Sequence, residues 1–203
     1  MPALAVIAKA PAPGRVKTRL CPPFRPDQAA AIAEAALLDT LASAGEVAAE
    51  RHVLVLDGAP EAWLPPSFEL LPQRGGGLAE RLAGAFEDLG GPALLIGMDT
   101  PQVTGGLLAD GLARLSESDA VLGPASDGGY WAIGLRQADR RVFERVPMSC
   151  ASTARVQLER LAACGLRVAV LPELRDFDTY DDAVQVAAMV PQGRFARALA
   201  AAT

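Results

Sequence analysis

The regular alternation of short apolar runs with longer helix-type segments is the feature that most constrains the fold of this chain. Seven short runs, nearly continuous in apolar residues, are typical of strands covered on both faces; they span residues 3–8, 52–56, 68–71, 93–97, 119–123, 130–135 and 167–171. Five longer segments predict helices, at residues 26–44, 78–89, 104–116, 151–164 and 179–189. With 203 residues and no internal linker, residues 1–203 are expected to form a single three-layer α/β/α domain with a mostly parallel sheet.

Composition excludes several classes of protein. A net charge of −5 argues against non-specific nucleic-acid binding. No apolar stretch reaches the roughly 18 residues of a membrane span, and no secretory signal is evident, so a cytoplasmic enzyme is expected. Cys21, Cys150 and Cys164 are too few and too scattered for a disulfide framework, and His52 is the only histidine. Any chemistry must therefore use carboxylates, cations and backbone groups, with or without a hard metal ion.

The loop after the first predicted strand is rich in cations. Ligands of open α/β sheets bind at the carboxyl ends of strands, and Arg and Lys at such a place suit phosphate. The alternative is a solvated basic loop, but the acidic balance of the whole protein favours an anion site. The candidate phosphate-binding residues are Lys9, Gly14, Arg15, Lys17, Thr18 and Arg19.

Asp99 follows the predicted strand 93–97 and should lie at the same edge of the sheet as the basic loop. A carboxylate beside phosphates suggests a magnesium or manganese ligand, since Mg²⁺ takes one or two carboxylates together with phosphate oxygens and water. The alternative is that Asp99 begins a turn or caps a helix.

Between the predicted strands 119–123 and 130–135 lies a polar, glycine-rich loop. Its candidate substrate-binding residues are Asp127, Gly128, Gly129 and Tyr130. Adjacent glycines permit close approach of the backbone to a ligand. Asp-Gly is also a strong hairpin signal, and the two interpretations are compatible.

Two further segments offer site residues. Asp176 and Asp178 precede a predicted helix, where Asp178 could cap the helix or give the metal a second carboxylate. Gly76, Gly77 and Arg81 stand where a glycine run enters the helix 78–89, whose amino end could face an anion or a base. Residues 191–203 could form a final helix that packs on the domain or on a second subunit as a homodimer.

Four motifs occur in order along nearly the whole chain: Ala-Lys9-x-Pro-x-Pro-Gly14-x-Val-Lys17-Thr-Arg19-Leu, Gly97-x-Asp99-x-Pro101, Gly-Pro124-x-x-Asp127-Gly-Gly-Tyr130 and Asp176-x-Asp178-Thr-x-x-Asp181. Together they resemble a bacterial family of the nucleotide-diphospho-sugar transferase superfamily, whose members are often described as glycosyltransferases. The chain is also similar to phospholactate guanylyltransferases and, more remotely, to molybdenum-cofactor guanylyltransferases.

The resemblance implies a GT-A-like fold and assigns roles to single residues. Arg15, Lys17 and Arg19 match the phosphate-contacting loop, while Asp99 and Asp178 match the metal-binding aspartates. The sequence departs from the family pattern Gly-Asp-Leu-Gly-x-Arg at residues 75–81, which leaves the nucleobase open. It also lacks the tryptophan that members of the family often carry after the proline that corresponds to Pro147. This departure leaves the acceptor contacts open.

These residues are compatible with three functions. The first is a Mg²⁺- or Mn²⁺-dependent transfer of a glycosyl group from a nucleotide sugar to a small acceptor, with Lys17, Asp99 and Asp127 as catalytic candidates. The second is nucleotidyl transfer from a nucleoside triphosphate with release of pyrophosphate. Both rely on positioning and charge stabilisation at the phosphates. The third is a nucleotide-binding protein without catalysis, against which the joint presence of Lys17, Arg19 and Asp99 argues.

Overall fold

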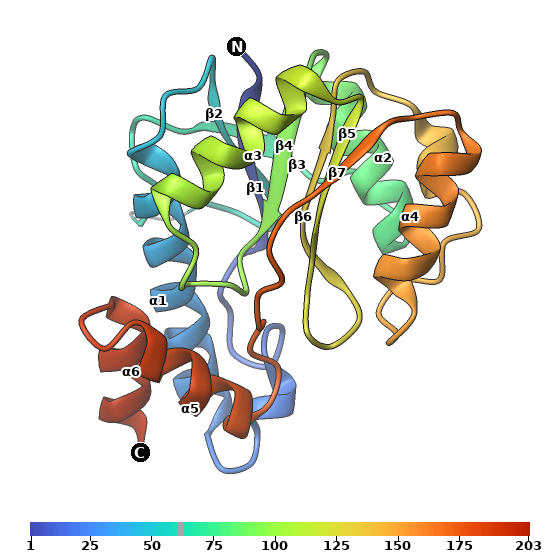
Figure 1. The fold of residues 1–203 in the computed structure, drawn as a ribbon. Coiled ribbons are helices and arrows are strands. Elements are labelled where there is room, and N and C mark those ends of the chain that lie inside the picture. The colour runs from blue at the N-terminus through green and yellow to red at the C-terminus, as the bar shows by residue number, and fades with distance from the viewer. Residues whose placement is uncertain (61–62) are drawn as a thin grey trace.

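The computed structural model describes residues 1–60 and 63–203, and a seven-stranded sheet forms its centre (Figure 1). The strands are β1 (Ala3–Lys9), β2 (His52–Asp57), β3 (Glu69–Pro72), β4 (Ala93–Gly97), β5 (Ala120–Pro124), β6 (Tyr130–Leu135) and β7 (Val168–Val170). They lie in the order β3-β2-β1-β4-β6-β5-β7. β6 runs antiparallel to both of its neighbours and the other pairs are parallel, which confirms the predicted mostly parallel sheet.

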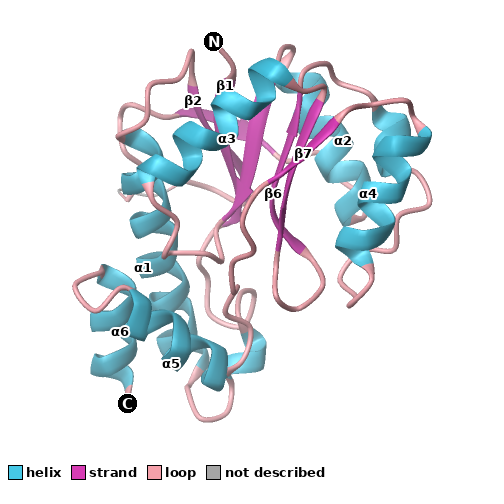
Figure 2. Cartoon of the chain, in the orientation of Figure 1, coloured by secondary structure: helices cyan, strands magenta, loops and turns pink. Residues whose placement is uncertain are grey.

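Helices cover both faces of the sheet, as the predicted three layers require (Figure 2). They are α1 (Pro26–Gly45), α2 (Leu78–Leu89), α3 (Gly105–Glu117), α4 (Thr153–Ala163), α5 (Tyr180–Met189) and α6 (Arg194–Ala202). Apolar residues of α1 and α3 share one core with the sheet, and those of α2 and α4 share the core on the opposite face. None of the helices among the described residues combines the length and the apolar character needed to cross a membrane.

Local sequence signals explain where the helices begin and end. Gly77 precedes α2 and Gly90 follows it with φ 71°, a conformation that glycine adopts without strain. The Oγ1 atom of Thr104 accepts a hydrogen bond from the Leu107 amide at 3.3 Å and so caps α3. Of the two roles that the sequence left open for Asp178, the helix cap is not the one observed: Thr179 caps α5 in a reciprocal pair with Asp182, which leaves Asp178 outside the helix.

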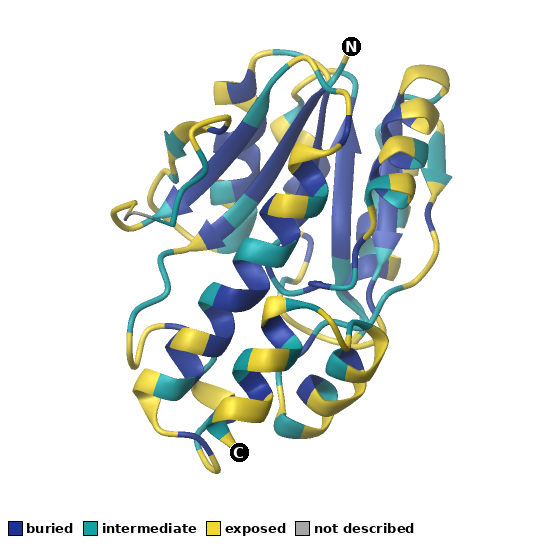
Figure 3. Ribbon diagram, turned by 90° about the vertical axis from the view of Figure 1, so that its left-hand side faces the viewer, coloured by how far each residue is buried: buried dark blue, intermediate teal, exposed yellow. Residues whose placement is uncertain are grey.

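α1 is rich in alanine because it is buried on two sides (Figure 3). One side packs on the sheet, while Ile32 and its neighbours meet a second apolar cluster formed with α5 and α6. In this cluster the rings of Phe177 and Phe195 lie 4.5 Å apart, and Phe177 is fully buried. The buried Phe177 therefore anchors the segment that carries Asp178 below the edge of the sheet.

Candidate functional site

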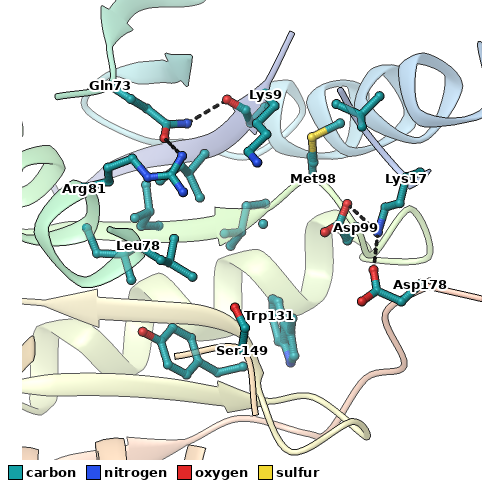
Figure 4. A pocket seen from close by; sticks show the side chains of 18 of the residues that line it. Lys9, Lys17, Gln73, Leu78, Arg81, Met98, Asp99, Trp131, Ser149 and Asp178 are labelled. Atoms are coloured by element: carbon teal, nitrogen blue, oxygen red, sulfur yellow. Dashed lines mark hydrogen bonds and ion pairs between the residues drawn. The ribbon is translucent and has the colours of Figure 1, made fainter. Parts of the chain in front are cut away.

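The main cavity has a volume of about 490 Å³ and lies at the carboxyl ends of β1 and β4 (Figure 4). The loop after β1, the amino end of α2 and the segment before α5 complete its walls, at the edge where open α/β sheets bind ligands. Most of the predicted phosphate and metal residues line this cavity; they are Lys9, Arg15, Lys17, Thr18, Arg19, Arg81, Asp99 and Asp178.

Lys17 joins the two predicted metal ligands. Its Nζ atom lies 3.0 Å from Oδ1 of Asp99 and 2.9 Å from Oδ1 of Asp178. The same atom donates to the carbonyl oxygen of Phe177 at 2.5 Å and lies 4.2 Å from the centre of its ring. Only 7% of the Lys17 side chain is exposed, and it is held by Phe177 and Asp178, which lie 160 and 161 positions later in the chain.

The charges of this cluster support one another. Burial alone would lower the pKa of the Lys17 ammonium, but Asp99 and Asp178 outweigh it and hold that pKa above its ordinary value. Burial likewise tends to raise the pKa of Asp178, but attraction to Lys17 and then Arg19 leaves it lowered. Lys17 and Asp178 are therefore both charged at neutral pH.

The remaining cations of the loop are open to the cavity. Lys9 and Arg15 are exposed, and neither forms an ion pair with a carboxylate within the described part of the chain. Arg19 is also exposed, and its Nη1 atom lies 2.9 Å from Oδ2 of Asp178. Lys9 and Arg15 can therefore bind an anion without first giving up a protein partner.

A second polar group stands at the far end of the same cavity, where Figure 4 shows Gln73 beside Arg81. Gln73 donates through Nε2 to the carbonyls of Ala8 at 2.7 Å and Val55 at 3.1 Å, and accepts from Nη1 of Arg81 at 3.2 Å. Arg81 also lies 3.5 Å from Asp57. Its Nε atom is buried without a partner among the described residues, so a hydrogen-bond donor remains available at this end.

A smaller cavity of about 230 Å³ adjoins the first and shares Arg19, Asp99 and Asp178 with it. It adds Asp127, Gly129 and Asp176, so carboxylates dominate its polar lining. Burial and the nearby charge of Asp127 raise the pKa of Asp176 to about 6. Among these residues the sequence motifs indicated Asp127 and Gly129 as substrate ligands and left Asp176 undecided.

Tyr130 lines both cavities, but its hydroxyl points away from them. The hydroxyl donates to Oε1 of the buried Gln157 at 3.4 Å, and burial raises the tyrosine pKa. Tyr130 therefore offers the site its aromatic ring and not a free hydroxyl.

Several predicted glycines do not line either cavity. Gly14 is an exposed loop residue with φ 75°, and Gly76 and Gly77 pack near Glu80 at the start of α2. A Cβ atom on Gly128 would lie 2.1 Å from the carbonyl oxygen of Ala151. These glycines shape the turns that carry Arg15, Arg81 and Asp127.

Asp99 and Asp178 fit a hard divalent cation in part. Their carboxylates converge on one cation, the Lys17 ammonium, and oxygen is the donor that Mg²⁺ and Mn²⁺ prefer. Among residues 1–60 and 63–203, no group of three or more His, Cys, Asp or Glu side chains could hold a metal ion. Two carboxylates alone leave most ligand positions to water and to a bound substrate.

Three solved structures show where this fold occurs. A "putative nucleotide-diphospho-sugar transferase" from Desulfovibrio desulfuricans is 26% identical, with a TM-score of 0.84 over 98% of this chain and 99% of that one. The 2-C-methyl-D-erythritol 4-phosphate cytidylyltransferase of Thermus thermophilus is 18% identical, with a TM-score of 0.58 over 94% and 100%. Rv0371c of Mycobacterium tuberculosis, in complex with manganese, is 19% identical, with a TM-score of 0.54 over 92% and 98%.

No curated protein matches the chain. The family model described as "Uncharacterized protein conserved in bacteria (DUF2064)" matches residues 30–150, which include Asp99 and the loop of Asp127. Together with the nucleotide-diphospho-sugar transferase fold shared with the D. desulfuricans protein, this match identifies the chain as a member of the DUF2064 family.

Proposed function

We propose that this protein is a metal-dependent transferase that uses an activated nucleotide, and that it moves a glycosyl group from a nucleotide-diphospho-sugar to a small acceptor. The observation that carries the proposal is the division of one continuous site. The open cations Lys9 and Arg15 line the larger cavity, and Asp127 and Asp176 line the smaller one. Asp99 and Asp178 line both cavities. A donor with a diphosphate and an acceptor without one would fill these two halves.

The diphosphate of the donor would lie against the loop after β1. Arg15 can grip a phosphate through two hydrogen bonds, and Lys9 contributes a point charge. The nucleoside would then extend towards Gln73 and Arg81, where the unpartnered Nε of Arg81 could donate to an acceptor atom of the base or ribose. The solved structures include a nucleotide-diphospho-sugar transferase by description and a cytidylyltransferase by name, which supports a nucleotide ligand.

Asp99 and Asp178 would hold the metal ion together with the donor phosphates. The ion would neutralise the negative charge that develops on the departing diphosphate. The manganese complex of Rv0371c supports a divalent ion in this fold. Since Lys17 and Arg19 already pair with these carboxylates, we expect the ion to bind well only when a nucleotide supplies further ligands and offers the cations a new anionic partner.

Nucleotidyl transfer is the second candidate. The density of Lys9, Arg15 and Arg19 along one loop would also suit the three phosphates of a nucleoside triphosphate. The residues would keep nearly the same roles, but the leaving group would be pyrophosphate.

The leaving group separates the two reactions. The protein would be incubated with Mn²⁺, an extract of small metabolites as the acceptor source, and either a panel of nucleotide sugars or the four nucleoside triphosphates. We expect release of nucleoside diphosphate from a nucleotide sugar, abolished in Asp99→Asn. Pyrophosphate released from triphosphates alone would establish nucleotidyl transfer, and absence of both products would favour a non-catalytic nucleotide-binding protein.

A further inference from the structure

We propose that the smaller cavity receives an uncharged, hydroxyl-rich acceptor, such as a sugar or polyol, and rejects phosphorylated molecules. The proposal rests on the proposed function, because it names the acceptor class for the second half of the same site. It depends on three independent features of that cavity: unpaired carboxylates, a buried hydroxyl without a partner, and an aromatic wall.

The carboxylates of the cavity lack cationic partners. Within the described part of the chain, no Lys, Arg or His nitrogen forms an ion pair with Asp127 or Asp176. Asp127 accepts a hydrogen bond from the Gly129 amide at 2.6 Å through Oδ1, which leaves acceptor capacity on its other oxygen. Asp176 is half-buried and Asp127 is exposed. A half-buried carboxylate without a cation is stabilised by hydrogen-bond donors, and a hydroxyl group is a donor that brings no net charge.

Thr100 provides the second feature. It lines the cavity, it is 1% exposed, and its Oγ1 atom has no hydrogen-bond partner among the described residues. Buried polar atoms are almost always satisfied, so an orphaned hydroxyl beside a cavity points to a ligand atom that completes it. A hydroxyl of the ligand can donate to Thr100 or accept from it.

Arg19, the cation that lines this cavity, is already engaged. Its Nη1 atom pairs with Oδ2 of Asp178 at 2.9 Å. A phosphate group would therefore meet Asp127 and Asp176 without a free cation to offset the repulsion. Lys9 and Arg15, the cations without such partners, line the larger cavity and not this one.

The walls suit the carbon skeleton of a sugar or polyol. Tyr130, Trp131 and Met148 line the cavity together with the polar residues. The indole nitrogen of Trp131 donates to the carbonyl of Pro172 at 3.0 Å, so the Trp131 ring presents an apolar surface. Such mixed walls match the apolar faces and polar rim of an uncharged polyol.

Saturation-transfer NMR on the apo protein tests the acceptor class without any nucleotide. The probes are glycerol, D-glucose and myo-inositol, each compared with its monophosphate, and D-glucosamine as the cationic alternative. We expect at least one uncharged probe to bind at least tenfold more tightly than its phosphate ester. Thr100→Val should weaken that binding at least fivefold, and Thr100→Ser, which keeps the hydroxyl, should retain it.

A variant with Asp127→Asn and Asp176→Asn should lose the discrimination against the phosphate esters, and circular dichroism would check that each variant folds. The proposal fails if the esters bind as well as the uncharged probes in the wild type, if only glucosamine binds, or if no probe binds. Because the nucleotide is absent, such a failure leaves the proposed function standing. Loss of nucleotide binding with retained polyol binding would contradict the proposed function and leave the polyol site standing.

Discussion

The two cavities that form the halves of the site differ in which of their charged groups lack a partner of opposite charge. In the larger cavity the exposed cations Lys9 and Arg15 have no carboxylate partner in the described chain, whereas in the smaller cavity Asp127 and Asp176 have no cation. Asp99 and Asp178 line both cavities and are paired with Lys17 and Arg19. The larger cavity thus holds unpaired positive charge, and the smaller cavity holds unpaired negative charge. This is the arrangement that a site for an anionic donor and a non-anionic acceptor requires.

The boundary between the two cavities, where Asp99 and Asp178 line both, should affect turnover more than any other part of the site. We expect Asp99→Asn to reduce release of nucleoside diphosphate by about a hundredfold or more, because metal and carboxylate stabilise charge that develops at the phosphates. Asp110→Asn is the matched control, since Asp110 forms an exposed pair with Arg114 on α3, away from both cavities. Equal activity of Asp99→Asn and the control would show that the boundary plays no part in catalysis.

The same boundary predicts competition between Lys17 and the metal. Lys17→Met removes the ammonium that pairs with both Asp99 and Asp178, so Mn²⁺ should bind the apo variant about tenfold more tightly than the wild type. Calorimetric titration of Mn²⁺ without nucleotide measures this, with Arg114→Met as the control for a lost surface charge. Unchanged or weaker Mn²⁺ binding in Lys17→Met would contradict a shared cation position.

The acidic half predicts a smaller, pH-dependent effect on stability. The folded protein holds the pKa of Asp176 at about 6, above its ordinary value of 3.8, so the folded state binds this proton more tightly than the unfolded state. The free energy of unfolding should therefore fall as the pH rises from about 4 to about 6 and then stay level with respect to this group.

The substitution Asp176→Asn removes this pH-dependent fall in the free energy of unfolding. Discounted for partial exposure, the gain should be on the order of 1 kcal/mol at pH 8, or about 2–4 °C in Tm, and should vanish near pH 4. Thermal unfolding of the metal-free protein with a chelator at both pH values measures it, with Asp181→Asn, on an exposed turn of α5, as the control. A destabilised Asp176→Asn at pH 8 would show that the carboxylate is stabilised by the fold.

Local signals predicted the elements of the fold well. Every predicted strand and helix is present, and α2 matches residues 78–89 at both ends because glycines mark its boundaries. The hairpin of β5 and β6 follows the Asp-Gly signal. Asp178 and Thr179 are both good capping residues with an acid three residues later, so the sequence alone did not decide between them. In the structure Lys17 and Arg19 hold the Asp178 carboxylate, and Thr179 caps α5.

Only those parts of the site that lie in recognisable sequence motifs could be predicted. The basic loop, Asp99 and Asp178 were expected at one edge, and the structure brings them together. The roles of Gln73 and Thr100 were not visible in the sequence. Gln73 bonds the ends of two strands that are remote in the chain, and Thr100 is defined by a missing partner. For Lys17 the sequence predicted phosphate contact but not the ion pairs with carboxylates 82 and 161 positions away.

The division of the site is tested most directly by titrating UDP and GDP, each with Mg²⁺, into the wild type and two variants by calorimetry. Arg15→Ala removes an open cation of the larger cavity and should weaken binding of the preferred nucleotide about tenfold, the cost of one charge-assisted contact. Asp127→Asn removes a charge of the smaller cavity and should change that affinity by no more than about twofold. Equal weakening in both variants, or none in Arg15→Ala, would contradict a donor half and an acceptor half.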